Sequence, residues 1–595
     1  MASKGIFFGG RNIVKPGVYA TVDASAMVPV RLGAANTIGV IGIASGSTPR
    51  TITPVLSPVD ARALLRGGVL ADIIDLMYDP SPDVPGAGDV HFYRLNAAIR
   101  SVLTLQEVGL TNVITLTSQD YGVWTNQIRA KIEAGSTTGK KITLNNVLTT
   151  VYEVGDNLGS AFTINYVGSK FAAQLIITKV GDVATTIQLQ TKANSGGDPW
   201  VTEVTQSLTV SALSTLGQFV AFLNGLGNFV TSAVGNSQMP TAYLDAVAGQ
   251  DIKSAPYTAS ALIGSIVHWV NSNSSLATAA RVVSATAAPA NLAFTFLQGG
   301  SEGAVPSNGD WQTALDAFAQ DDVSFIFVCS EDAAVHAMAL AHCNAQSDVK
   351  ARRERMTFVG ASWGETTAQA VARAGAMADR RAVLCYPGLK RVNLFSGLVD
   401  QLSPMYTAAC VCGMAGGLPP EVPLTFKSIR CNGLETVLSQ TDIETLLNYG
   451  VLAVEQVPSQ GIFRIVQGIT TYLQDNNTVW RKIAGIRIAD YLSRTIRDAL
   501  DPYIGRIGDK RTVTSILNRT VSVLGAQTRG PANQAGVLTT GTDLQGNFEP
   551  AFKNVRAVYD GQELVSISYE CHPVGEVAFI TVVAGLTPTM IVEAS

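Results

Sequence analysis

Residues 291–387 alternate between short apolar runs and amphipathic stretches, and this alternation restricts the possible folds more than any other feature of the chain. Three runs, at 323–329, 356–359 and 382–386, are almost entirely apolar. The stretches around them, such as 331–346, have the composition of helices. Strands that are apolar on both faces and alternate with helices indicate a parallel sheet covered on both sides. We therefore predict an α/β centre built on a doubly wound parallel sheet.

The N-terminal part of the chain carries a smaller set of α/β signals. Residues 37–43 and 91–95 have the composition of strands, and the stretches 58–65 and 72–78 between them are typical of helices. We predict a strand, two helices and a second strand within residues 31–100.

Residues 101–290 differ in composition and patterning from the segments on either side. Strand-like patches rich in Ser and Thr are separated by Gly, Asn and Asp turns, and charges are sparse. Only the stretch 213–226 has helical spacing. This pattern predicts one β-rich domain, or two, on the outside of the molecule.

The last region, residues 431–595, combines a long amphipathic helix with strands. Residues 478–500 place apolar side chains every four positions on one face and charged side chains on the opposite face. Residues 481–511 hold eight Lys or Arg and four Asp or Glu, a local net charge of +4. Residues 565–571 alternate between apolar and polar side chains, which predicts a strand, and a more apolar strand is expected over 576–583.

Residues 18–22, near the N-terminus, also alternate with a period of two. A strand at a chain end with no hairpin partner has two interpretations. Either it is the first strand of the local domain, or it is donated to another subunit.

Charged residues make up only 15% of the 595 residues, whereas an ordinary soluble protein has about 25%. No apolar run approaches the roughly 20 residues of a membrane-spanning helix, so we predict no membrane insertion. The remaining place to bury apolar surface is a large permanent oligomer. The net charge of −4 gives no reason to expect direct nucleic-acid binding.

Neither the cysteines nor the histidines form a pattern that would hold a metal or cofactor. The seven cysteines are odd in number and lack zinc or disulfide spacing, so we expect reduced, mostly buried thiols and no cofactor. A cluster of three arginines, at Arg352, Arg353 and Arg355, is typical of either a solvated helix end or a subunit contact.

Several segments resemble, in the same order, the tail sheath proteins of contractile phages and related injection machines. The resemblance covers roughly two thirds of the chain and leaves out the middle region. The segments that carry it are PGVY (16–19), IGVIGIASG (38–46), the strand that holds Arg94, FTFLQGGSEG (294–303), DWQTALDAFAQDDVSFIFV (310–328), NGLETVLSQTDIETLLNYGVLAVEQ (432–456), VWRKIAGIRIADYLSRTIRDAL (479–500) and HPVGEVAFITV (572–582).

The resemblance implies a non-enzymatic virion protein that forms stacked hexameric rings around a tail tube and contracts to drive the tube through the host envelope. It would be made in the host bacterial cytoplasm, and its partners would be itself, the tube protein, and the baseplate and tail terminator proteins. The implied domains are an N-terminal arm (1–30), an N-terminal α/β segment (31–100), a β-rich outer domain (101–290), a central α/β domain (291–430) and a C-terminal α+β polymerisation domain completed by terminal strands (431–595).

In that family the terminal segments add strands to a sheet of a neighbouring subunit. The residues expected to form these linking strands are Val18, Tyr19, Ala20, Val22, Val565, Ile567, Tyr569, Val577 and Phe579. A contact to an acidic tube surface is expected from Arg487, Arg494, Arg497, Lys510 and Arg511. The alternative for these cations is an exposed helix with pairs such as Arg494–Asp498 and Arg497–Asp501.

Two other functions compete with a sheath. One is a different helical virion polymer, such as an inner tube. The other is a serine esterase, because residues 360–364 read G-x-S-x-G between an apparent strand and helix, as a nucleophile elbow around Ser362 requires. Only His572 follows Ser362 in the chain, in a segment expected to belong to another domain, so we predict a tight turn with small residues for close packing and no enzyme.

Overall fold

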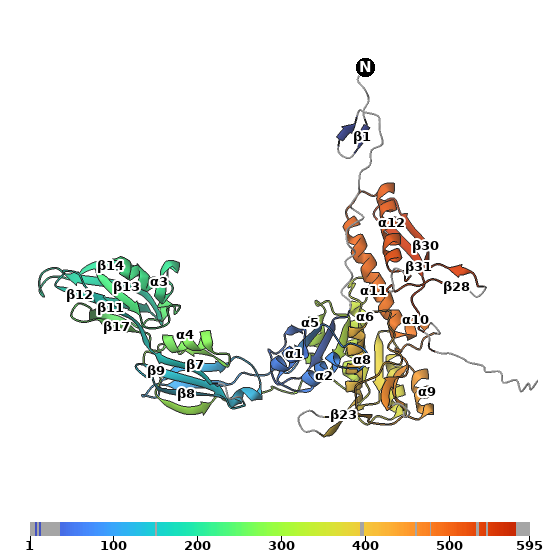
Figure 1. Cartoon of the computed structure of the whole chain (residues 1–595), viewed down its shortest axis with the longest axis horizontal. Coiled ribbons are helices and arrows are strands. Elements are labelled where there is room, and N and C mark those ends of the chain that lie inside the picture. The colour runs from blue at the N-terminus through green and yellow to red at the C-terminus, as the bar shows by residue number, and fades with distance from the viewer. Residues whose placement is uncertain are drawn as a thin grey trace, which may run out of the picture.

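The chain folds into a central α/β body, a long arm and a C-terminal unit (Figure 1). The arm leaves one side of the body, and the C-terminal unit projects from the body in a different direction. A computed structural model describes residues 6–8, 11–13, 36–148, 152–392, 398–457, 461–475, 478–530, 535–542, 546–576 and 578.

The body is built on an eight-stranded sheet with the order β27-β26-β22-β21-β20-β3-β5-β4. The six strands from β26 to β5 are parallel, and β27 and β4 are antiparallel edge strands. In chain order the strands are β3 (Ile38–Gly42), β4 (Ile52–Val55), β5 (Val90–Arg94), β20 (Phe325–Val328), β21 (Met356–Gly360), β22 (Ala382–Tyr386), β26 (Val451–Val457) and β27 (Ile462–Ile465).

Helices cover both faces of this sheet, because its central strands are apolar on both sides. In β20, Phe325 and Phe327 point into one core, and Ile326 and Val328 point into the other. The first core is shared with α1 (Pro58–Leu65), α2 (Val69–Tyr78) and α8 (Pro404–Gly417). The second is shared with α5 (Asn308–Phe318), α6 (Ala333–Gln346), α7 (Thr367–Met377) and α9 (Gln440–Asn448).

The prediction of a large, mostly parallel sheet is therefore confirmed, and its strands come from three of the expected segments. The strands β3 to β5 come from residues 31–100, and β26 and β27 come from the region expected to form a separate C-terminal domain. A smaller sheet, β24-β23-β25, lies beside the body, with the bounds β23 (Leu389–Val392), β24 (Val399–Leu402) and β25 (Gly433–Leu434).

The arm is β-rich, as predicted, and it contains two separate hydrophobic cores. The unit next to the body has the sheets β18-β7-β6 and β10-β9-β8-β19, and the distal unit has β15-β11-β17 and β14-β13-β12-β16. The near unit comprises β6 (Val102–Gln106), β7 (Asn112–Ser118), β8 (Ile128–Ala134), β9 (Lys140–Asn146), β10 (Tyr152–Leu158), α4 (Gly264–Asn273), β18 (Ala277–Arg281) and β19 (Leu292–Phe296). The distal unit comprises β11 (Ser160–Tyr166), β12 (Ala172–Val180), β13 (Val183–Lys192), β14 (Val201–Ser207), α3 (Leu216–Gly225), β15 (Phe229–Ala233), β16 (Val247–Asp251) and β17 (Tyr257–Ser260).

Strand β19 pairs with β8, so the near unit of the arm includes residues up to Phe296.

The C-terminal unit is a helical hairpin that packs against a two-stranded sheet. Its helices α11 (Ile483–Leu500) and α12 (Lys510–Ala526) follow the short α10 (Thr478–Arg481). Its sheet pairs β30 (Phe552–Tyr559) with β31 (Val565–Cys571), and a small hairpin pairs β28 (Gly541–Thr542) with β29 (Phe548–Glu549). At the other end of the chain, β1 (Ile6–Phe8) pairs with β2 (Arg11–Ile13). Over the residues that the structure describes, no helix is both long enough and apolar enough to cross a membrane.

Helix α8 is buried along nearly its whole length, and glycines allow its close packing. A Cβ atom built on Gly360, at the end of β21, would lie 2.2 Å from the backbone nitrogen of Met405 in α8. The first glycine of the G-x-S-x-G motif is therefore needed for contact between strand and helix, because no side chain fits there.

We predict that Gly360→Ala destabilises the body by about 1–3 kcal/mol or more, because α8 must move away from β21. Gly375→Ala is the matched control, since Gly375 lies in α7 with no atom within 4 Å of an added Cβ. This second change should be neutral or stabilising by up to about 1 kcal/mol. Thermal unfolding of the two variants checks this difference, and a Gly360→Ala variant as stable as the wild type would contradict it.

Candidate functional site

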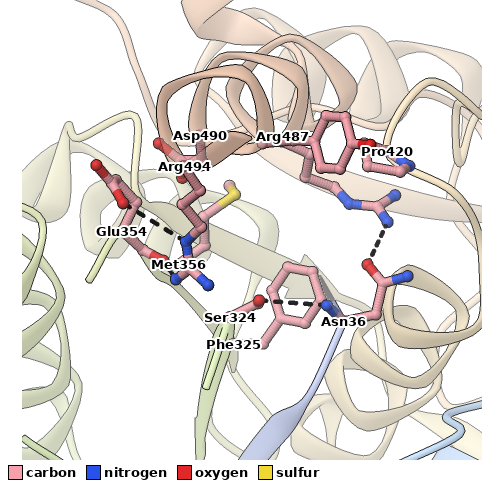
Figure 2. A pocket seen from close by; sticks show the side chains of 10 residues that line it. Asn36, Ser324, Phe325, Glu354, Met356, Pro420, Arg487, Asp490 and Arg494 are labelled. Atoms are coloured by element: carbon pink, nitrogen blue, oxygen red, sulfur yellow. Dashed lines mark hydrogen bonds and ion pairs between the residues drawn. The ribbon is translucent and has the colours of Figure 1, made fainter. Parts of the chain in front are cut away.

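Helix α11 connects the C-terminal unit to the body, and its two faces have different partners. Its apolar face, with Ile488, Leu492 and Ile496, packs with Val523 and Leu524 of α12. Its charged face, which was expected to be exposed or to contact a tube, is turned toward the body. The junction between this charged face and the body is the candidate site (Figure 2).

Arg487 lies at the centre of the junction and is only 5% exposed. Its Nη2 donates hydrogen bonds to the carbonyl oxygens of Ala415 (2.8 Å) and Leu418 (2.5 Å), at the C-terminal end of α8. It also donates to Oδ1 of Asn36 at 3.2 Å, as Figure 2 shows. Burial lowers the pKa of Arg487 to about 10. A cation that caps the exposed carbonyls of a helix end is favourably placed, and here it fixes α11 to α8.

Glu354, on the body side, holds two arginines of α11. Arg497 Nη2 donates to Glu354 Oε2 at 2.6 Å, and Arg497 Nη1 contacts the other carboxylate oxygen. Arg494 Nε lies 3.5 Å from the same carboxylate, and Arg494 Nη1 donates to Asp322 at 3.1 Å. Burial of Glu354 opposes its charge, but the hydrogen bond and charge of Arg497, with the charge of Arg494, hold the pKa of its carboxyl below the usual value.

Asp490 and Arg381 form the third contact between α11 and the body. Arg381 Nη1 and Nη2 donate to the two carboxylate oxygens of Asp490 at 2.9 and 3.1 Å. Burial raises the pKa of the Asp490 carboxyl, and the charge of Arg381 opposes that rise. Such bidentate pairs have a fixed geometry, so they set the angle between α11 and the body.

The junction contains a small cavity of about 30 Å³, lined by Asn36, Phe325, Met356 and the charged side chains of α11. A space of this size holds about one water molecule. A larger hollow of about 920 Å³ adjoins the junction, and its lining includes Asp322, Glu354, Arg494 and Arg497. Within the described ranges, no group of three or more His, Cys, Asp or Glu is placed to hold a metal ion.

The structure separates the five cations that were expected at a tube contact. Arg487 and Arg494 are buried at 5% and 8% exposure, and they donate hydrogen bonds to groups of the same chain. The tube contact expected from these two residues stays a prediction. Arg497 is partly exposed but bound to Glu354, whereas Lys510 and Arg511 are exposed at the start of α12.

Arg494 and Arg497, for which pairs within the helix were the alternative, form ion pairs with Asp322 and Glu354 of the body. Arg355, expected at a solvated helix end or subunit contact, is fully buried and donates to the carbonyls of Phe318 and Asp321. The sequence interpretation missed the role of Glu354. The signal in the sequence was Glu354 itself, because it is the single acidic residue in the run 352–355 and the other three residues are arginines.

The expected linking strand at residues 565–571 is β31, and its alternation is confirmed. Val565, Ile567, Tyr569 and Cys571 are half-buried, whereas the three residues between them are exposed. The strand pairs with β30 of its own chain, and Phe552, Val555 and Tyr569 pack toward α12. Among the described residues, neither β30 nor β31 has a second neighbouring strand. The expected strand residues Val18, Tyr19, Ala20, Val22, Val577 and Phe579 lie outside the described residues.

Ser362 has no catalytic surroundings. Its Oγ donates to the carbonyl oxygen of Glu331 at 2.8 Å and accepts from Arg373 Nη2 at 2.6 Å. The nearby His336 is buried, and its Nε2 contacts the carbonyl oxygen of Ser330, while burial lowers its pKa to about 4. His572 lies in the C-terminal unit, where its Nε2 contacts Glu549 at 2.7 Å. Among the described residues, the hydrogen-bond partners of the Ser362 hydroxyl are an arginine and a carbonyl, and neither can act as a general base.

Comparisons with known proteins point to one family. Residues 304–471 match the family model of the phage tail sheath protein central domain. The tail sheath protein of Bacillus phage SP01 is 32% identical over 518 residues, which cover 86% of this chain and 88% of that protein. The tail sheath protein of Staphylococcus phage Twort is 25% identical over 551 residues, covering 88% and 91%. The crystal structure of a sheath tail protein from Desulfitobacterium hafniense has a similar fold, with a TM-score of 0.51, 14% identity and coverage of 93% and 100%.

We predict that Glu354→Ala destabilises the protein by about 3–5 kcal/mol, because it leaves two buried or half-buried arginines without their counter-charge. The control is Asp322→Ala, whose side chain is 58% exposed and should contribute less than about 1 kcal/mol. Urea unfolding followed by circular dichroism measures both.

The effect of Glu354→Ala should depend on pH. Because the folded-state pKa of Glu354 is depressed, its contribution is present at neutral pH and is lost as the pH falls through that pKa. The gap between wild type and Glu354→Ala should therefore narrow in acid. If Glu354→Ala and Asp322→Ala lowered the free energy of unfolding equally at neutral pH, Glu354 would contribute no more to the junction than an exposed carboxylate.

Proposed function

The chain belongs to the phage tail sheath protein family and is a structural protein of a contractile phage tail, and from this premise we propose how it assembles and moves. It forms hexameric rings that stack helically around a tail tube, and it contracts to drive the tube through the host envelope. Its partners are other copies of itself, the tube protein, and the baseplate and tail terminator proteins. It is assembled in the host cytoplasm before it becomes part of the virion tail.

The observation that carries this proposal is the two-stranded sheet β30–β31 at the surface of the C-terminal unit. A sheet of two strands has two edges with free backbone N–H and C=O groups, and a pair of strands alone is marginally stable. Strands from neighbouring copies complete such a sheet through backbone hydrogen bonds, and alternate side chains set the register. We propose that residues 18–22 of one copy and 577–583 of another add to this sheet.

The buried junction of α11 supports a division between rigid and flexible parts. Arg487, Arg494 and Asp490 hold the C-terminal unit to the body through contacts inside one chain. The body and the C-terminal unit then rotate together as one rigid subunit. Contraction exchanges one packing of these rigid subunits for another of lower energy, and the strands keep the copies connected.

The turn between α11 and α12 is the proposed contact to the tube. Ile504 and Ile507 are 83% and 81% exposed in this turn, and Lys510 and Arg511 follow directly. Exposed apolar and basic side chains together suit a partner surface that is acidic around an apolar patch. The doubly wound arrangement of the central sheet and the outward position of the arm complete the proposed subunit.

Deletion of residues 1–24 tests the linking strands. We expect the shortened chain to fold, because the body and its two cores lie beyond this segment, but to fail to form connected cylinders. Electron microscopy of purified assemblies is the measurement, and circular dichroism of the monomer is the control for folding. Connected cylinders that still contract would contradict strand donation.

Reversal of two charges tests the contact to the tube. Lys510→Glu with Arg511→Glu should weaken co-assembly with tubes about tenfold or more at low salt, since both attractive contacts become repulsive. Lys170→Glu with Lys350→Glu is the matched control, because both lysines are exposed and lie outside the C-terminal unit. Pelleting with purified tubes measures the difference, and equal pelleting of the two double variants would exclude this turn as the contact.

A further inference from the structure

The arm is joined to the body by two chain segments that run side by side. Ile99 N donates to the carbonyl oxygen of Ser301 at 2.8 Å, and Val102 N donates to that of Gln298 at 2.7 Å. Two paired strands of this kind, without other contacts, would bend easily under load. Further contacts lie at this joint, where the arm meets the body (Figure 1).

Arg94 is the central residue of these contacts, and it is fully buried at the end of β5. Its Nη1 donates to the carbonyl oxygen of Ser47 at 2.7 Å, and its Nη2 donates to Glu302 Oε2 at 2.7 Å. Asn96 also donates to Glu302 Oε2 at 3.0 Å, and its Oδ1 accepts from the backbone of Ala44 at 3.2 Å. One arginine therefore connects the body to the segment that returns from the arm.

Glu302 extends this network into the base of the arm. Its Oε1 accepts a hydrogen bond from the backbone nitrogen of Val123 at 3.0 Å, while its Oε2 accepts from Arg94. A single carboxylate thus binds a side chain of the body and the backbone of the arm. Asp120 adds a parallel contact, because its Oδ1 accepts from the backbone nitrogen of Ser47 at 2.8 Å.

The backbones at the joint approach too closely for side chains. A Cβ on Gly122 would lie 2.4 Å from the carbonyl oxygen of Ser45, and a Cβ on Gly303 would lie 2.3 Å from that of Ala97. Both glycines have positive φ, at 106° and 79°, which favours glycine. Arg66 stacks 4.4 Å from the ring of Trp124, and so ties a body loop to the arm base.

We propose that Arg94 and Glu302, with the glycines at 122 and 303, are positioning residues that hold the arm at one fixed angle to the body. The motif at 299–303 is therefore a joint, and the near unit of the arm moves together with the sheet that carries Arg94. In the assembly, which rests on the proposed function, each rotation of the body is transmitted to the near unit. The stiffness of the joint itself is a property of the single subunit and is tested there.

Hydrogen exchange of the full-length subunit tests the proposal, with Glu302→Ala as the variant. The Val123 amide loses its acceptor, so peptides covering 119–127 should exchange roughly tenfold or more faster. Peptides from the distal sheet of β12 and β13 should keep their protection. Glu302→Gln retains the shape but only one of the two acceptor oxygens, so its exchange rate should lie between those of Glu302→Ala and the wild type. Arg50→Ala is the control, because it breaks an exposed ion pair of 2.6 Å with Asp310 on the same body.

Single-particle images of the same proteins give the second readout, the spread of angles between arm and body. We expect a narrow spread of arm–body angles in the wild type and in Arg50→Ala, and a clearly broader spread in Glu302→Ala. An unchanged spread in Glu302→Ala would overturn the proposal, even with faster exchange at 119–127. Faster exchange throughout the body sheet would also overturn it, because the residue would then serve general stability and not the joint.

Discussion

The parallel pairing of β3 with β20 is the interaction on which the rest of the structure depends. It joins residues about 290 positions apart, from Ile38 opposite Phe325 to Ile41 opposite Val328, and it makes one sheet from two segments of the chain. This pairing places Asn36 beside Arg487 of α11, and it brings the end of β5 close to the chain that returns from the arm. Both attachments of the body, to the arm and to the C-terminal unit, therefore follow from one strand pair.

Several ion pairs lie where the parts of the chain meet. Arg94 with Glu302 lies at the arm, and Arg381 with Asp490 and Glu354 with Arg494 and Arg497 lie at α11. Buried ion pairs contribute little net stability, because desolvation offsets the attraction between the charges. They do define geometry, since a buried charge that loses its partner is costly, and an arrangement with any other angle between the parts would lose it. In this protein the apolar cores provide the stability of each part, and the ion pairs determine how the parts are oriented.

The sequence predicted what depends on local periodicity and missed what depends on distant partners. The sequence predicted the apolar strands β20, β21 and β22, because a strand buried on both faces is apolar at every position. It also predicted the alternation of β31, because a strand buried on one face is apolar at every second position. The charged face of α11 gave the same pattern that an exposed helix gives, and only the position of Glu354 distinguishes the two. Helix α12 was missed, although Asp509 caps it and Ile516, Val523 and Leu524 have helical spacing. The pairing of β19 with β8, about 160 residues away, was not predictable from local periodicity.

The two segments that connect the arm to the body are joined by a hydrogen bond from the backbone nitrogen of Ile99 to the carbonyl oxygen of Ser301. An insertion whose ends already touch adds little loop-closure entropy to the host fold, whatever its length. The body sheet can therefore close whether the inserted arm is long or short. In this architecture the arm is an insertion that enters and leaves the body at one point, so its length is free to vary without interrupting the strands of the sheet.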